Sequence, residues 1–340
     1  MPGTPFLKPS LVMMILAVLL LAVFMISLIT GSIAIPLQEV GGRIVKGVTH
    51  WQCDDSTDRI LWLTRLPRIM LALLVGATMG MTGLASQTLF RNPLASPYII
   101  GVSNGAAVGA VVGLLASSFI PYTLVPVLSV CSGLTVSLLV FLLAQRGGHF
   151  GQSLLLAGMA IGAFCSSLTA GALYVAGERL QTLVFWLMGG VWQATWRDVL
   201  VMLPLCGICL ISLSILAPAM NVSLTGDRTA RDLGVNVVRL QRQLLVLIAV
   251  ATSVSVSLTG VIGFIGLVVP HLLRLAMGAD HRHLMPATAL GGAVLLLGAD
   301  TLARTLVAPA EIPVGILTAL VGAPVFLWIL LRHGAGRAGE

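Results

Sequence analysis

The feature that most limits how this chain can fold is a series of long stretches without any Lys, Arg, Asp or Glu. An α-helix needs about 20 consecutive apolar residues to cross the hydrocarbon core of a bilayer. Stretches of at least that length occur at Pro9–Gln38, Ile69–Phe90, Asn92–Gln145, Gly147–Gly177, Val199–Gly226, Gln243–Leu273 and Ile312–Leu331. The sequence therefore predicts several membrane-spanning helices.

Composition excludes the soluble and disordered classes of protein. Of the 340 residues, 57% are hydrophobic and 9% are charged, whereas an ordinary soluble domain is about 25% charged. A soluble fold of this size could not cover so much apolar surface, and disordered chains are rich in charge. A transmembrane β-barrel would alternate apolar and polar residues, while these stretches are continuously apolar. The expected fold class is therefore all-α and polytopic.

We predict about ten transmembrane helices within a single membrane domain that covers residues 1–340. The first apolar stretch, Leu11–Thr30, is longer than the core of a signal peptide, so we interpret it as a retained span. An even number of spans places both termini on one side, and the loops on that side carry more Lys and Arg, which indicates the cytoplasm. The expected spans are 11–33, 61–90, 98–116, 122–144, 152–175, 198–217, 243–262, 264–277, 285–303 and 313–331.

Two segments interrupt the helical pattern. Pro93 and Pro97 lie between the second and third spans, and proline both lacks an amide donor and disfavours helix at the residue before it. We expect a tight connection there. The series Gly260, Gly263 and Gly266 predicts a helix break or a close backbone approach. Broken spans often line a transport route, and a plain turn between two spans is the alternative.

A cytoplasmic loop carries two pairs of opposite charges, spaced four residues apart. They are Asp227 with Arg231 and Arg228 with Asp232, a spacing that stabilises helices. Thr225 is suited to cap the start of such a helix, and Gly234 is suited to end it. We interpret the segment as a short amphipathic helix that docks a cytoplasmic partner, with a solvated loop as the alternative.

Three arginines on the expected outer side, Arg65, Arg68 and Arg304, run against the usual charge bias of membrane proteins. Each could extend its charged head from the membrane into water. As a group they would form a positive rim suited to an acidic partner. Asp300 is the acid well inside a span, which makes it a functional candidate. Its position four residues before Arg304 favours a simple ion pair instead.

Patterns for covalent chemistry are lacking. The sequence has no GxxxxGK[ST], so the chain does not use ATP through a P-loop. Cys206 and Cys209 match CxxC, but we interpret them as small apolar residues of a lipid-buried helix. We interpret His281 and His283 as a polar turn rather than a metal site. We expect no catalytic residue, metal site, cofactor or nucleic-acid partner for this chain.

A series of longer motifs adds to this interpretation. In their order and over about residues 60–331, they resemble the FecCD family of ABC-importer permeases, which includes permeases for vitamin B12, haem and ferric siderophores. The matching segments are Arg65–Arg68, Gln87–Pro97, Gly101–Ala106, Phe185–Gly190, Gly226–Gly234, Gly263–Arg274, Ala299–Arg304, Glu311–Gly315 and Gly322–Pro324.

The resemblance implies the type II ABC importer fold, with ten transmembrane helices in each of two permease subunits around a central pathway. It implies two cytoplasmic ATPase subunits that hold ATP and Mg²⁺, and an extracytoplasmic substrate-binding protein. A homodimer in the cell membrane is expected. The loop at about 218–242 would carry the helix that couples to the ATPase. The coupling residues would be Gly226, Asp227, Arg228, Ala230, Arg231, Leu233 and Gly234.

The same resemblance assigns two further groups of residues. Acidic residues of the binding protein would meet Arg65, Arg68 and Arg304. The inner gate would lie near the connections Asn92–Pro97 and His149–Ser153, with Asn92, Pro93, Leu94, Pro97, Gln152 and Ser153 as its residues. The stretch Gly147–Gln152 departs from the pattern expected of vitamin B12 permeases, and the loop Arg43–Asp58, with Cys53, lies outside the motifs.

The expected substrate is a ferric siderophore or a similar iron chelate, with haem or vitamin B12 as the alternative. Four side chains could line a route for a flat apolar ligand or anchor the chain at the membrane interface. They are Phe185, Trp186, Met188 and Trp192. An ion-coupled secondary transporter would need several intramembrane acids or histidines. An integral membrane enzyme would need a polar constellation at one depth, which the spans lack.

Overall fold

The computed structural model describes residues 7–31, 36–50, 55–147 and 150–335, and within them the chain forms helices and no strands. Four short elements are not α-helical: η1 (Ile60–Arg65), η2 (Pro97–Ile100), η3 (Tyr122–Leu124) and η4 (Gly177–Arg179). The α-helices are α1 Pro9–Ile29, α2 Leu37–His50, α3 Ser56–Arg59, α4 Leu66–Leu89, α5 Val102–Leu115, α6 Val125–Gln145, α7 Phe150–Tyr174, α8 Leu180–Met188, α9 Trp196–Ser223, α10 Asp227–Asp232, α11 Val237–Thr259, α12 Ile265–Met277, α13 His281–Ala303 and α14 Val314–Ala335.

The all-α prediction is thus confirmed for the described residues. Seven helical segments there are long and apolar enough to cross a membrane, and three shorter apolar helices accompany them, α5, α12 and the first part of α14. Each of the ten expected spans falls on one of these segments. Because three of them are short, the count of about ten transmembrane helices is not confirmed.

Several boundaries differ from the expectation. Helix α9 has 28 residues and continues to Ser223, so the loop expected at 218–242 shrinks to α10 and its short connections. The amphipathic helix α2 and the short helix α8 were not predicted. In the part of the 43–58 loop that is described, Arg43 forms ion pairs with Glu39, Asp55 and Asp58. Cys53 lies outside the described residues.

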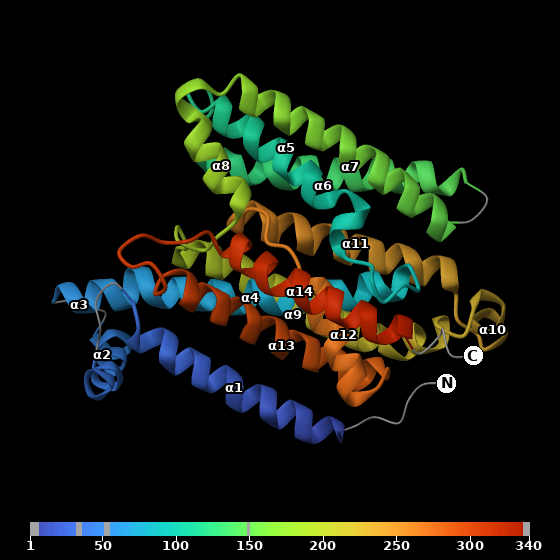
Figure 1. Ribbon diagram of the computed structural model, residues 1–340, viewed down its shortest axis with the longest axis horizontal. Helices are drawn as coiled ribbons and strands as arrows, with labels where there is room; N and C mark the ends of the chain where they lie inside the picture. The colour runs from blue at the N-terminus through green and yellow to red at the C-terminus, as the bar shows by residue number, and fades with distance from the viewer. Residues whose placement is uncertain (1–6, 32–35, 51–54, 148–149, 336–340) are drawn as a thin grey trace.

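Helix α4 runs through the centre of the molecule and packs against α13, α9, α11 and α12 (Figure 1). Its contact with α13 is a backbone approach. A Cβ atom added to Gly76 would lie 2.4 Å from the carbonyl oxygen of Gly292, and one added to Gly292 would lie 2.1 Å from that of Gly76. Helices in lipid gain little from burying apolar groups against each other, so small residues that permit close packing hold them together.

The helices define two ends of the molecule. Helices α2 and α3 lie at one end, which we call the α3 end, whereas α10, the start of α1 and the end of α14 lie at the opposite end, the α10 end (Figure 1). The backbone N–H of Leu7 donates to Ala276 at the end of α12, which fixes the start of the described chain there. Both ends of the described chain therefore lie on the side of α10.

The close approach of α4 and α13 gives a first prediction. Gly76→Ala is expected to lower the melting temperature of the detergent-solubilised protein, because the new methyl group meets backbone that cannot move aside. Gly207→Ala in α9 is the control, since no atom lies within 4 Å of its added Cβ and alanine favours helix by about 1 kcal/mol. Equal melting temperatures for the two variants would contradict the assigned role of Gly76.

Candidate functional site

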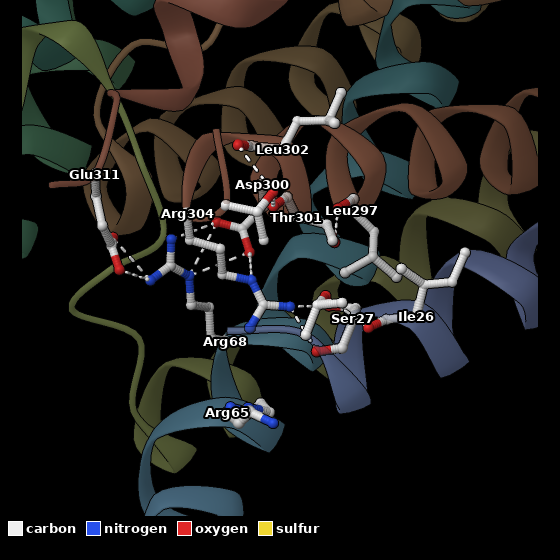
Figure 2. A network of polar contacts seen from close by, with 12 residues as sticks. Ile26, Ser27, Arg65, Arg68, Leu297, Asp300, Thr301, Leu302, Arg304 and Glu311 are labelled. Atoms are coloured by element: carbon white, nitrogen blue, oxygen red, sulfur yellow. Dashed lines mark hydrogen bonds and ion pairs between the residues drawn. The ribbon is translucent and has the colours of Figure 1, made fainter. Parts of the chain in front are cut away.

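The three arginines expected at the outer face come together at the α3 end, where Arg65 and Arg68 lie at the start of α4 and Arg304 follows α13 (Figure 2). They are not an exposed rim: their residues are only 4%, 6% and 7% exposed. Nor do their heads extend into water, as the alternative interpretation required. We call these arginines, with Asp300 and Glu311, the arginine cluster.

Arg68 is the centre of this cluster. Its Nε and Nη2 atoms donate to the Asp300 carboxylate at 2.9 and 2.8 Å, and its Nη1 donates to both oxygens of Glu311 at 3.0 and 2.9 Å. The expected pair of Asp300 with Arg304 is present at 3.8 Å, but the hydrogen bonds of Asp300 go to Arg68. Paired guanidinium and carboxylate groups of this kind form strong, directional contacts.

Arg65 and Arg304 contact the end of α1. Arg65 Nη1 donates to the carbonyl oxygen of Leu28 at 2.6 Å, and Arg304 Nη2 donates to the carbonyl oxygen of Ser27 at 2.6 Å. The last carbonyl groups of a helix lack partners within the helix and carry partial negative charge, so cations are favourable there. These two arginines therefore tie α1 to α4 and α13.

Glu311 is the member of the arginine cluster that reaches the surface. Its side chain is 41% exposed, compared with 8% for Arg68 and 0% for Asp300. Sequence reasoning placed Glu311 in a motif but gave it no role, because the separation from Arg68 in the chain hides their contact. With three arginines and two carboxylates, the cluster keeps one formal positive charge.

At the opposite end, the expected docking helix is present as α10. Gly234 ends it with φ of +82°, as predicted, but Thr225 does not cap it and instead donates its hydroxyl to Val222. Within the described residues, neither predicted ion pair of α10 forms. The Asp227 carboxylate pairs with Arg91, which lies just after α4, and Arg231 Nε donates to the backbone oxygen of Asp227 at 3.1 Å.

The other expected coupling residues define two faces of α10. Ala230 is fully buried, on the side of α10 that faces the bundle. Helix α10 contacts α9 and α11 there. Arg228 and Arg231 are exposed, as are Gly234 and the apolar side chain of Leu233, while Gly226 is half-buried. A charged face with one apolar residue thus points away from the protein.

The first expected gate segment is a tight turn between α4 and η2. The Asn92 side-chain oxygen accepts from the backbone N–H of Leu94 at 2.9 Å, which closes the turn, and Pro93 is exposed. Pro97 starts η2. The next residue, Tyr98, donates its hydroxyl to the backbone oxygen of Ile262, so the turn is connected to the region between α11 and α12.

The second expected gate segment lies elsewhere in the structure. Gln152 and Ser153 belong to the first turn of α7 and not to a loop; residue 149 lies outside the described part. A hollow of about 580 Å³ separates this helix start from α10, and Phe150, Asp227 and Arg231 are among the residues that line it. Helix α10 therefore contacts Arg91, next to the first expected gate segment, and faces the second across this hollow.

The predicted break near residues 260–266 is confirmed. Helix α11 ends at Thr259, and α12 starts at Ile265. Between them, Gly260 has φ of +68° and Phe264 has φ of +67°. Beside this break lies an open groove of about 680 Å³, which the end of α8 and the start of α14 complete.

The groove is almost entirely apolar. Met188, Phe264 and Pro324 are among its lining residues, whereas Trp186 and Trp192 line a separate hollow beside it. Of the four side chains considered for a flat ligand, Met188 thus lies on a different surface from Trp186 and Trp192, and Phe185 packs against Trp192. The contribution of α14 to the groove could not be predicted, since nothing in its sequence indicates that it lies beside the break.

His281 lies in neither an exposed turn nor a metal site. It is fully buried, while His283 is exposed. Its Nε2 lies 2.7 Å from the Thr88 hydroxyl, and its Nδ1 lies 2.7 Å from the side-chain oxygen of Asn221. In the described part of the chain, no three His, Cys, Asp or Glu side chains gather as metal ligands would. The sequence offered no local signal for this contact.

The arginine cluster gives a second prediction. Asp300→Asn leaves two buried arginines with one carboxylate fewer, so we expect a loss of about 3–5 kcal/mol of stability. Glu311→Gln is the matched control: it removes the same charge from the same Arg68, but at a half-exposed position where a pair contributes about 1 kcal/mol or less. Thermal unfolding of the solubilised protein measures both. Similar melting temperatures would contradict the central place of Asp300.

Comparison with known proteins places this architecture in a family. The pattern of the FecCD transport family matches residues 19–332. The hemin transport system permease protein HmuU of Yersinia pestis is 45% identical over 293 residues, which cover 82% of this chain and 85% of that protein. The vitamin B12 import system permease protein BtuC of Klebsiella pneumoniae is 39% identical over 324 residues, covering 93% and 92%.

The fold agrees with these relatives. An inward-facing structure described as a metal-chelate type ABC transporter superposes with a TM-score of 0.84 at 32% identity, covering 95% of this chain and 99% of that one. The relatives with established names are permease proteins, which are transport components. The chain therefore belongs to the FecCD transport family and is a multi-pass permease of the ABC transporter type.

Proposed function

We propose that this chain forms the membrane pathway of an ATP-driven importer that moves a ferric siderophore or a similar iron chelate into the cytoplasm. The observation that carries this proposal is the apolar groove of about 680 Å³ beside the break between α11 and α12. A non-helical backbone at membrane depth is tolerated where it lines a cavity. Such a surface suits a bulky ligand that the protein releases readily.

Haem and vitamin B12 are the alternative substrates. The relatives named for hemin and vitamin B12 transport support these two substrates. Their support is equal to that which the metal-chelate transporter gives to an iron chelate. The groove carries few polar groups that would select among these ligands, so we assign most of the selectivity to the substrate-binding protein.

The transporter we propose contains two copies of this chain. In one copy the groove is open along the face formed by α8, the break between α11 and α12, and α14. A second copy facing it would close the two grooves into one central pathway, and closed assemblies with twofold symmetry are the commonest form of oligomer. The dimer would lie in the cell membrane, surrounded by lipid.

We place the α10 end in the cytoplasm, together with both chain termini. The exposed charged face of α10 and Leu233 would fit a groove on each of two ATPase subunits, which hold ATP and Mg²⁺. Closure of the ATPases on ATP would move α10 as a rigid element and switch the pathway between its two openings. The gate segments at 92–97 and 152–153 would close its cytoplasmic side.

We place the α3 end outside, where the arginine cluster would receive an acidic substrate-binding protein. The cluster keeps one formal positive charge, which would attract acidic side chains and raise the rate of encounter. Because the arginines are buried, the partner's carboxylates would reach them past Glu311, the exposed member.

Substrate identity is tested by reconstitution into liposomes with the ATPase and the binding protein. We expect ATP-dependent uptake of a labelled ferric siderophore that exceeds the uptake of haemin and cobalamin. A preference for haemin or cobalamin would establish the alternative. Uptake that persists with an inactive ATPase, and that needs an ion gradient, would instead indicate a secondary transporter.

The docking role is tested at Arg65. Arg65→Gln is expected to weaken binding of the substrate-binding protein about tenfold, equivalent to ~1.4 kcal/mol, because it removes a positive charge from the cluster. Arg65→Lys keeps the charge and a donor for Leu28, so its affinity should stay close to that of the native protein. Surface plasmon resonance measures the affinity, and copurification of the ATPase shows that the complex is intact. Equal affinities for both variants would contradict the assignment.

A further inference from the structure

Helix α10 is attached to one of the two gate segments and separated from the other. We propose that α10 moves the turn at Asn92–Pro97 directly, through the ion pair of Arg91 with Asp227 and a buried bridge at His281, and does not act directly on the start of α7. This proposal rests on the proposed function, and it names the residues by which the ATPase-facing helix would control the pathway.

The ion pair joins the residue just before the turn to the first residue of α10. Arg91 immediately precedes the turn, and Asp227 is the first residue of α10. Arg91 has φ of +48°, a left-handed conformation that is uncommon for residues other than glycine and that follows directly on the end of α4. Arg231, one helical turn along α10, donates to the backbone oxygen of Asp227. The partner of Arg91 is therefore held in place by α10 itself.

The bridge at His281 joins the helices that lead into the turn and into α10, and it is buried. Thr88 lies in the last turn of α4, just before Arg91, and Asn221 lies in the last turn of α9, just before α10. His281, the first residue of α13, contacts the side chains of both at 2.7 Å. It fixes the spacing between the helix ends that lead into the turn and into α10.

The hydrogen bonds of the bridge define the orientation of Asn221. The Asn221 nitrogen donates to Asp280 at 2.7 Å, so its oxygen faces His281 and accepts from Nδ1. Nε2 lies 2.7 Å from the Thr88 hydroxyl, which also donates to the backbone oxygen of Leu84 at 3.0 Å. Desolvation opposes the charge on Asp280, but hydrogen bonds from the Arg282 backbone and from Asn221 hold the pKa of Asp280 below its ordinary value. The charged carboxylate thus orients the side-chain oxygen of Asn221 toward His281.

The start of α7 has no comparable attachment. In the described residues, no hydrogen bond or ion pair joins α10 to α7, and the hollow of about 580 Å³ lies between them. The turn, by contrast, continues into Tyr98, which donates to Ile262 inside the break between α11 and α12. A displacement of α10 would therefore pass through Arg91 and the turn to the wall of the apolar groove.

Exchange of the two charges tests the ion pair. The assembled transporter, with ATPase and binding protein, is prepared with Arg91→Glu, with Asp227→Arg and with both. We expect Arg91→Glu to copurify with the ATPase and to lose about fivefold or more of its uptake per ATP hydrolysed, the lower range of coupling between two sites. Asp227→Arg, which alters the docking helix itself, should lose at least as much uptake per ATP in the complexes that assemble. The double variant should recover to within about twofold of the native ratio.

Asp232 supplies the matched control, because it is the other acid of α10, is exposed, and forms no ion pair within the described residues. Arg91→Glu combined with Asp232→Arg restores the net charge without restoring the contact, so it should stay as impaired as Arg91→Glu alone. If this control recovers as well as the exchanged pair, or if Arg91→Glu keeps native uptake per ATP, the proposal is overturned.

His281 is tested as a positioning residue by two substitutions. His281→Gln keeps one donor and one acceptor and should retain more uptake per ATP than His281→Leu, with both compared at matched amounts of folded complex. Equal ratios for the two variants would exclude the bridge from coupling. Failure of the proposed function itself is distinguishable, because the native chain would then bind no ATPase or show no ATP-dependent uptake.

Discussion

The antiparallel packing of α4 against α13 is the interaction on which both ends of this protein depend. At the α3 end Arg68 binds Asp300, in the middle Gly76 and Gly292 bring the two backbones together, and at the α10 end Thr88 contacts His281. Helices in lipid are held by close packing and polar contacts, and this pair has both along its length. Substitutions at its glycines would therefore disturb two distant sites at once.

The polar residues of the two ends are arranged differently. At the α3 end, three buried arginines are held by two carboxylates and by the last carbonyl groups of α1. This cluster has one net positive charge, and Glu311 is its exposed member. At the α10 end, a buried histidine connects the ends of α4, α9 and α13, and an exposed ion pair connects the end of α4 to α10. In the transporter that we propose, the first arrangement would receive an acidic partner and the second would convey movement of α10.

Much of the architecture could be predicted from the chain alone. The apolar stretches predicted helices at each of the ten segments, the series Gly260 to Gly266 predicted the break between α11 and α12, and Gly234 predicted the end of α10. These features are local, because helix length, glycine conformation and charge-free composition are read over neighbouring residues. Predictions of side-chain partners succeeded less well: Asp227 was expected to pair with Arg231 and pairs with Arg91.

The sequence by itself determined that this chain is helical, resides in a membrane and belongs to a family of permeases, because hydrophobic length and ordered motifs are properties of the linear chain. Only the tertiary structure decided that the arginines are buried, that Glu311 covers Arg68, and that His281 joins α4 to α9. Those contacts link residues far apart in the sequence. Their geometry is set by how closely the helices pack, which no local spacing encodes.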